Sequence, residues 1–323
     1  MELSKEREGD IPIFSVVIPL RGRWGTRLRN CVESIVNQTL QPLEIIVADY
    51  GSTEEGHDAI METLEDYDCT VYYYPTDEIW SLAVARNLGI RRSNPKCENV
   101  AVIDADLILE SRVIEALSRA HASRPRSYIS CFIGMLRPKF IARFEEFLKN
   151  CVAVGQSCED GILEYRKLYP RRPVEVPDEF QLPRDSAKLR GIARAAGSGV
   201  SAGWGGLVSA PRDWFFKVRG FDERMKFWGA EDGDLWKRAG LDGMNCYRIN
   251  DLEEADTEVY HQFHKDCISS RYPHPYGIIG LTPEEERHID WNKTLLVRDN
   301  SIMRNNDTWG LWKAQDRGDE FVY

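Results

Sequence analysis

The sequence has no long hydrophobic run. No stretch of it reaches the roughly 20 apolar residues that a membrane-spanning helix requires. The first ten residues are charged and lack the apolar centre of a secretory signal. We therefore expect a soluble, cytoplasmic protein without a transmembrane segment, and the sequence leaves its oligomeric state open.

Positive charge and closely paired cysteines are also scarce. The formal net charge is -10, whereas binding to nucleic-acid phosphates needs clustered Lys and Arg, so we expect no nucleic-acid partner. None of the eight cysteines forms a Cys-x-x-Cys pair, which argues against a zinc cluster. Several lie in apolar runs, where we expect reduced thiols that pack as small hydrophobic groups.

The first hundred residues show alternating strand and helix patterns. Short apolar runs predict strands at 14–20, 43–48, 70–74 and 100–103, and helical patterns lie between them, including one at 79–91. This alternation predicts an α/β fold with a mostly parallel, Rossmann-like sheet flanked by helices. Asp49, Asp104 and Asp106 follow such strands, at the sheet edge where ligands bind.

The second half of the sequence is less regular. It predicts a helix at 140–154, a long loop at 168–194, and later elements listed at the end of this paragraph. We divide the chain into a first half (1–110), a smaller second half of the same domain (111–270), and a C-terminal extension to which the sequence assigns no role (271–323); the resemblance described below implies that the first half binds a nucleotide sugar and that the second binds the acceptor and is catalytic. The later predicted elements are a strand at 203–210, a helix that has Pro211 in its first turn, a helix at 231–239 and a strand at 257–263.

Asp104-Ala105-Asp106 presents two carboxylates directly after a buried strand. Mn²⁺ and Mg²⁺ prefer oxygen ligands and share them with substrate phosphates. The Asp-x-Asp pattern also occurs at Asp66/Asp68 and Asp232/Asp234, so the pattern alone fits a surface turn equally well. Only its place at a strand end favours a metal site.

The segment 227–234 combines aromatic, small and acidic residues. Carboxylates are favourable at a helix start, so Glu231 and Asp232 could simply interact with the helix dipole. The neighbouring Trp228 could stack on a sugar ring, and Gly229 would let an acceptor approach the backbone. A carboxylate beside them could then act as a general base.

A Tyr-His-Gln-Phe-His segment follows at 260–264. A histidine at a strand end can complete a metal shell. On a strand, His261 and His264 point to opposite faces, so at most one of them is a ligand. A single histidine is more often structural, and only the two acidic motifs make this one a metal candidate.

The order of these motifs resembles that of the family 2 glycosyltransferases of the GT-A fold. The resemblance rests on segments 15–19, 31–40, 43–53, 85–89 and 104–106. The family usually has two aspartates before Gly-Ser, and here Tyr50 replaces the second. The resemblance implies that the following residues hold the nucleotide sugar: Pro19, Arg21, Asp49, Arg86, Asn87, Asp104, Ala105 and Asp106.

Segments 203–206, 220–232 and 260–262 are similar to galactosyltransferase-like and chondroitin-polymerase-like members. That resemblance implies that Asp232 is the base with Glu231 beside it, and that Asp106 and His261 hold Mn²⁺ or Mg²⁺. It assigns the acceptor to Trp204, Trp228 and Gly229. It further implies an inverting hexosyltransferase of polysaccharide biosynthesis that uses a UDP-sugar in preference to a GDP-sugar and a saccharide or other hydroxyl acceptor.

Two other functions fit parts of the sequence. A nucleotidyltransferase that makes sugar nucleotides needs a basic glycine-rich loop, and residues 21–27 could be mistaken for such a loop. A nucleotidyltransferase has no need, however, for the segment 228–232. A non-catalytic carbohydrate-binding protein would use the nine Trp and thirteen Tyr for stacking, yet it needs neither a metal nor a base.

Overall fold

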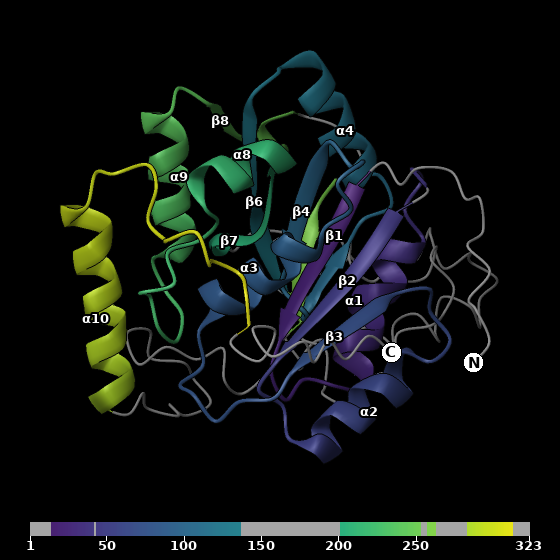
Figure 1. The fold of residues 1–323 in the computed structure, drawn as a ribbon. Helices are drawn as coiled ribbons and strands as arrows, with labels where there is room; N and C mark the ends of the chain where they lie inside the picture. The colour runs from purple at the N-terminus through teal and green to yellow at the C-terminus, as the bar shows by residue number, and fades with distance from the viewer. Residues whose placement is uncertain (1–13, 42, 137–200, 253–256, 263–282, 313–323) are drawn as a thin grey trace, which may run out of the picture.

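A computed structural model describes residues 14–41, 43–136, 201–252, 257–262 and 283–312 of the chain. A nine-stranded sheet runs through its centre, with helices on both faces (Figure 1). The strands are β1 (Phe14–Leu20), β2 (Leu43–Tyr50), β3 (Thr70–Tyr74), β4 (Asn99–Ile103), β5 (Leu107–Leu109), β6 (Ser127–Leu136), β7 (Ser201–Pro211), β8 (Asn245–Arg248) and β9 (Val259–Gln262).

The strand order is β3-β2-β1-β4-β7-β6-β9-β5, and β8 pairs with β6. The strands β1 to β4 pair in parallel, which confirms the predicted Rossmann-like half. Beyond β4 the sheet changes direction, because β7 runs antiparallel to both β4 and β6. The start of β7 therefore lies beside the carboxyl end of β4, where Asp104 follows.

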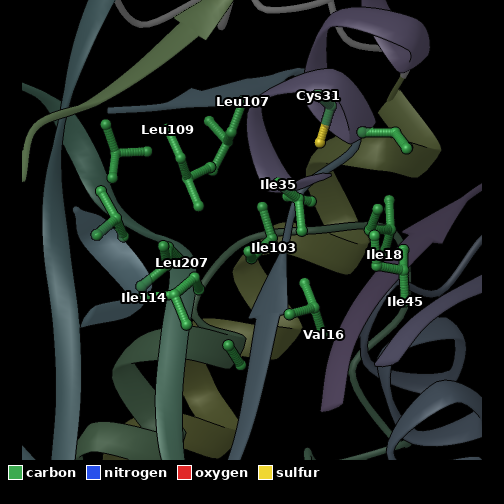
Figure 2. Packing of buried hydrophobic residues seen from close by; sticks show 14 of the residues in the cluster. Val16, Ile18, Cys31, Ile35, Ile45, Ile103, Leu107, Leu109, Ile114 and Leu207 are labelled. Carbon is green, nitrogen blue, oxygen red and sulfur yellow. The ribbon is translucent and has the colours of Figure 1, made fainter. Parts of the chain in front are cut away.

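Two helical layers cover the sheet. The alternation of side chains along β1 shows why: Val16 and Ile18 pack into one apolar cluster, and Val17 packs into another on the opposite face. Figure 2 shows the first cluster, in which Ile35 of α1 faces these strands. The first cluster includes residues of α1 (Thr26–Val36), α2 (Glu54–Leu64) and α4 (Val113–Ser123), and the second includes residues of α3 (Leu82–Arg92), α8 (Arg212–Val218) and α9 (Glu231–Leu241).

Two predicted helix starts differ from those in the structure. The predicted helix at 79–91 is α3, and it starts three residues later because Ser81 accepts a hydrogen bond from Val84 N at 3.3 Å as an N-cap. The predicted start of a helix at Pro211 needs a similar correction. Pro211 is the last residue of β7, and α8 begins at Arg212.

The C-terminal part contains a helix that the sequence analysis did not identify. Helix α10 (Pro283–Arg298) packs against the outer side of α9 (Figure 1). A short 3₁₀ helix (Ile249–Leu252) lies between β8 and β9. The helix and the loop predicted at 140–154 and 168–194, and His264, lie outside the described residues. None of the described helices is both long and apolar enough to cross a membrane.

Candidate active site

The site lies where β4 ends and β7 begins. Asp104 follows the last residue of β4, and its backbone N–H donates to Gly206 O of β7 at 2.7 Å. The Asp-Ala-Asp motif and the Gly-Trp-Gly-Gly segment, about 100 residues apart in the chain, are therefore direct neighbours. The other two Asp-x-Asp pairs differ, because Asp66 and Asp68 are exposed after α2 and Asp234 points into a buried charge cluster.

Arg86 joins the site together. This α3 residue is 1% exposed, and its Nη2 donates to Asp104 Oδ1 at 2.9 Å while its Nη1 donates to Asp232 Oδ1 at 2.6 Å. Glu231 Oε1 lies 3.8 Å from the same Nη1 atom. One guanidinium thus binds the end of β4 and the start of α9, and the site is built around three carboxylates and one cation.

This excess of negative charge changes proton affinities. Loss of hydration raises the pKa of Glu231 to about 7, and the neighbouring Asp232 charge adds to the rise. Desolvation also raises the pKa of Asp104, although Arg86 opposes that shift. Burial alone would lower the pKa of Arg86, but the carboxylates outweigh it, so the guanidinium stays charged. The site therefore holds a fixed positive charge beside Asp232.

The loop before α9 is strained. Phe227 and Ala230 have positive φ values of 67° and 76°, which residues with a side chain rarely adopt. Two backbone hydrogen bonds hold this loop to the start of α3: Phe227 N donates to Trp80 O at 2.6 Å, and Leu82 N donates to Phe227 O at 3.1 Å. Helix α9 then begins at Glu231, so both carboxylates occupy its first turn, where the helix dipole favours them.

Gly205 shows what the glycines of the Gly-Trp-Gly-Gly segment do. Its φ is +101°, and a Cβ atom built on it would lie 1.9 Å from Asp232 Oδ2. Only a glycine leaves room for the Asp232 carboxylate at this place. The sequence analysis assigned the segment to the acceptor and did not anticipate this contact.

Asp106 and His261 also meet, as predicted. Gln262 N donates to Asp106 O at 2.8 Å, and His261 Nε2 lies 3.4 Å from Asp106 Oδ1. Two ligands that bind one octahedral ion at about 2.1 Å and at right angles are about 3 Å apart, so this pair fits a shared Mn²⁺ or Mg²⁺. Among the described residues, no group of three or more His, Cys, Asp or Glu side chains is placed to hold a metal.

Asp49 lies near the carboxyl end of β2 and is fully buried. Its Oδ2 is 3.0 Å from His57 Nδ1, and its Oδ1 accepts from Ser52 N at 3.3 Å. The His57 ring stacks on Tyr73, with centroids 4.1 Å apart. Burial raises the pKa of Asp49. The base-binding role assigned to Asp49 stays a prediction, and a ligand would meet this carboxylate together with His57 and Tyr73.

Tyr50, the atypical residue of the motif, belongs to a different cluster. It is 1% exposed and packs with Tyr74 and α3 on the face opposite Asp49, and its hydroxyl donates to Glu78 Oε2 at 3.3 Å. Desolvation and the charge of Glu78 raise the pKa of Tyr50 to about 12. The replacement of aspartate by tyrosine therefore alters packing against α3 and leaves Asp49 in place.

Arg21 lies beside Tyr50. Its Nε donates to Tyr50 O at 2.6 Å, its Nη1 donates to Glu78 O at 2.8 Å, and its guanidinium lies over the Tyr50 and Trp80 rings. Its Nη2 is buried and has no hydrogen-bond partner in the part of the chain that the structure describes. The predicted contact of Arg21 with the nucleotide stays a prediction.

The other predicted residues occupy several positions. Asn87 is fully buried and donates to Phe221 O at 2.9 Å and to Glu223 Oε1 at 3.0 Å, so it supports the segment before α9. Pro19 and Ala105 are buried near the site, and Trp228 is 37% exposed. Trp204 lies on β7 opposite Phe132, and only its backbone is described. The predicted contacts of these residues with donor and acceptor stay predictions.

Five of the eight cysteines lie in the described residues, and all five are free. Cys31, Cys97 and Cys131 are buried, and Cys31 Sγ lies 3.6 Å from Asp104 O at the edge of the site. Burial raises the pKa of the Cys31 and Cys131 thiols, which keeps them protonated. The expectation of core thiols is confirmed for Cys31, Cys97 and Cys131, whereas Cys69 and Cys246 are only half-buried.

Comparison with known proteins agrees with this geometry. Residues 15–143 match the model of glycosyl transferase family 2, and residues 197–265 match the model of the N-terminal domain of galactosyltransferase. The chain is a glycosyltransferase, and its residues 15–143 match family 2. The predicted GT-A fold and the predicted enzyme class are both confirmed, and the two matched segments are those that Arg86 joins in this glycosyltransferase.

Individual relatives are distant. The chain is 26% identical over 329 residues to validoxylamine A glucosyltransferase of Streptomyces hygroscopicus, covering 97% of this chain and 71% of that one. It is 27% identical over 262 residues to chondroitin synthase of Escherichia coli, covering 77% of this chain and 34% of the synthase. One similar solved structure is that of the mannosyltransferase PcManGT of Pyrobaculum calidifontis in complex with GDP-Man and Mn²⁺. The match has 16% sequence identity and a TM-score of 0.46, and it covers 90% of this chain and 71% of that one.

Proposed function

We propose that this glycosyltransferase moves a hexose from a nucleoside-diphosphate sugar to a hydroxyl group of a saccharide, with inversion at the anomeric carbon. The observation that carries the proposal is Arg86, whose two nitrogens hold Asp104 of the donor motif and Asp232 of the acceptor motif 2.9 and 2.6 Å away. Arg86 thus contacts both the proposed donor motif and the proposed acceptor motif.

Asp232 is the proposed general base. Arg86 Nη1 holds its Oδ1 at 2.6 Å, and the Asp232 side chain keeps 16% of its surface exposed, so an acceptor hydroxyl can reach it. The carboxylate removes the hydroxyl proton as the oxygen attacks the anomeric carbon. Attack from the side opposite the departing diphosphate inverts that carbon. Trp228 and Gly229 line the approach of the acceptor.

Asp106 and His261 are the proposed metal ligands. A bound Mn²⁺ or Mg²⁺ would supply Lewis-acid neutralisation of the diphosphate. The chain itself contributes the carboxylate and imidazole that face each other at 3.4 Å. Arg21 and Asp49 hold the nucleotide in this proposal, which divides the chain into a donor half at 1–110 and an acceptor half at 111–270.

The donor and acceptor classes are inferred from chemistry and from relatives. The relatives named a glucosyltransferase and a chondroitin synthase support hexose transfer and a saccharide acceptor. We propose a UDP-sugar as the preferred donor and a GDP-sugar as the alternative, as the resemblance of the chain to galactosyltransferase-like members implies.

The test is a panel of UDP- and GDP-sugars with Mn²⁺, Mg²⁺ or EDTA, with and without saccharide acceptors. We expect free nucleoside diphosphate to be released only with a metal, and NMR of the product to show the anomeric configuration opposite to that of the donor. Release of pyrophosphate from a nucleoside triphosphate would contradict the proposal and indicate a nucleotidyltransferase. Product with the configuration of the donor would contradict inversion alone.

A further inference from the structure

Residues 299–312 form a segment, here called the C-terminal clasp, that the reaction scheme does not use. It follows α10 and runs across α9 towards α3 (Figure 1). Its contacts with both helices involve buried charged and polar groups rather than loose surface packing. The sequence analysis assigned no role to this part of the chain.

Arg304 is the central contact of the clasp. Its side chain is fully buried, and its Nη2 donates to Asp234 Oδ1 of α9 at 2.8 Å. The other oxygen of Asp234 accepts from Nε of Arg238, also fully buried, at 2.8 Å. Asp234 is thus held by two arginines, one from its own helix and one from the clasp.

Asp234 belongs to the same helical turn as the proposed base. Helix α9 begins at Glu231, and Asp234 N donates to Ala230 O at 2.8 Å to close this turn. The residue before the helix, Ala230, has a strained positive φ, so the turn needs support from outside to keep its place. Arg304 supplies that support on the side of α9 away from Arg86.

The far end of the clasp contacts the donor side of the molecule. Gly310 N donates at 2.8 Å to Glu223 Oε1, the same oxygen that accepts from Asn87. Two residues later, the Trp312 ring packs edge-on against Tyr50, with centroids 5.9 Å apart. The clasp therefore spans from the helix that carries the base to the strand that carries Asp49.

We propose that Arg304 is a positioning residue for the glycosyl transfer step, acting through Asp234 to fix the first turn of α9 and hence the Asp232 carboxylate. This inference rests on the proposed role of Asp232 as the base. A displacement of about 1 Å at a reacting group can reduce a rate on the order of 100-fold. Arg304 should therefore act on kcat and leave donor affinity largely unchanged.

The test compares Arg304→Gln with Asp307→Asn. Asp307 lies on the same clasp, but its side chain is 90% exposed and pairs only with Arg219 among the contacts described for it, so it is a matched control. Hydrogen exchange of residues 227–236 is measured in both variants, together with kcat and the KM for donor. Asp234→Asn keeps the shape of the side chain and removes the Arg304–Asp234 ion pair by changing its acidic partner. This variant replaces Arg304→Gln in the test if Arg304→Gln does not fold.

For Arg304→Gln we expect faster exchange in residues 227–236, unchanged exchange in β1 to β4, a kcat reduced about 10- to 100-fold and a donor KM within about 3-fold of the original. Asp307→Asn should stay within about 2-fold in both constants. The double variant Arg304→Gln/Asp234→Asn should lose less activity than the product of the two single losses, because both substitutions remove the Arg304–Asp234 ion pair.

A kcat within 2-fold of the original, in a variant whose α9 exchanges faster, would overturn the inference. So would faster exchange throughout the sheet, because the loss of activity would then reflect unfolding. If the unaltered protein transfers no sugar from any donor, the proposed function fails, and the exchange data still decide whether Arg304 holds α9.

Discussion

Arg86 and its carboxylate partners show how much of this site depends on single residues. The sequence analysis assigned Arg86 to the donor from its motif, and the structure places both of its terminal nitrogens on protein carboxylates. The planar guanidinium of a buried arginine holds two such groups in a fixed geometry, whereas a lysine offers a compact charge on a flexible stem. Its main effect is to hold the Asp104 and Asp232 carboxylates in place.

Asp232 is expected to be essential for transfer and dispensable for folding. Asp232→Asn keeps the shape of the side chain but cannot accept the proton, so we expect transfer to fall at least about 100-fold with donor binding retained. Steady-state transfer assays and calorimetric titration with donor measure the two effects. The control is Asp68→Asn, an exposed aspartate of another Asp-x-Asp pair. Near-normal turnover in Asp232→Asn would rule out this base.

Glu231 predicts a dependence of stability on pH. Its pKa is raised from 4.5 to about 7 in the folded protein. Below pH 4.5 the carboxyl is protonated in both states and costs nothing. Between pH 4.5 and 7 the unfolded chain ionises first, so stability falls as pH rises, and above pH 7 the full cost is present.

Glu231→Gln removes that cost. We expect the variant to be more stable than the original by about 1–3 kcal/mol at pH 8 and equally stable near pH 4. Urea unfolding at both pH values measures the difference. A variant that is destabilised more at pH 8 than at pH 4 would show that the ionised carboxylate contributes favourably.

At the level of strands and helices, Gly205 of β7 limits what the site tolerates. Gly205→Ala adds a methyl group 1.9 Å from Asp232 Oδ2 in a backbone conformation that strains any side chain. We expect a loss of about 1–3 kcal/mol in stability and a large loss of transfer. The control is Gly240→Ala in α9, where a methyl group meets nothing within 4 Å and should be neutral or slightly stabilising. Equal activity in the two variants would contradict this packing.

The sequence predicted those elements whose signals are local. The strand at 14–20 is correct at both ends because all seven of its side chains are buried, which gives an uninterrupted apolar run. Helix α10 escaped notice because its exposed residues outnumber the three buried ones, Ile289, Asn292 and Leu295, and leave little apolar periodicity. Strand β6 was missed because nothing near it in the chain shows that it pairs with β7.

Motifs identified the candidate residues of the site, but they did not indicate which of these residues contact one another. Asp104, Asp106, Asp232 and His261 follow from motifs, and the structure brings Asp106 beside His261. The contact between Arg86 and Asp232 spans 146 residues, and the role of Gly205 depends on a three-dimensional approach. Arg304 had no motif at all, since its meaning comes only from the buried Asp234 that it meets.

For the whole molecule, we expect donor and metal to stabilise the fold together. A ligand at 100 times its Kd adds about 2.7 kcal/mol to the free energy of unfolding. A nucleoside diphosphate should therefore raise Tm in Mn²⁺ more than in EDTA, and Asp106→Asn should abolish that difference. An equal rise in EDTA, measured by thermal unfolding, would show that the nucleotide binds without a metal.

The antiparallel pairing of β7 with β4 also has a consequence for how the chain reaches its native state. Ile103 pairs with Leu207, so one edge of the parallel half-sheet stays open until about 100 further residues have left the ribosome. An unpaired edge strand can join a strand of another chain, and pairings this distant in sequence form slowly. We therefore expect that chaperones that shield strand edges affect the yield of the folded protein more than its final activity.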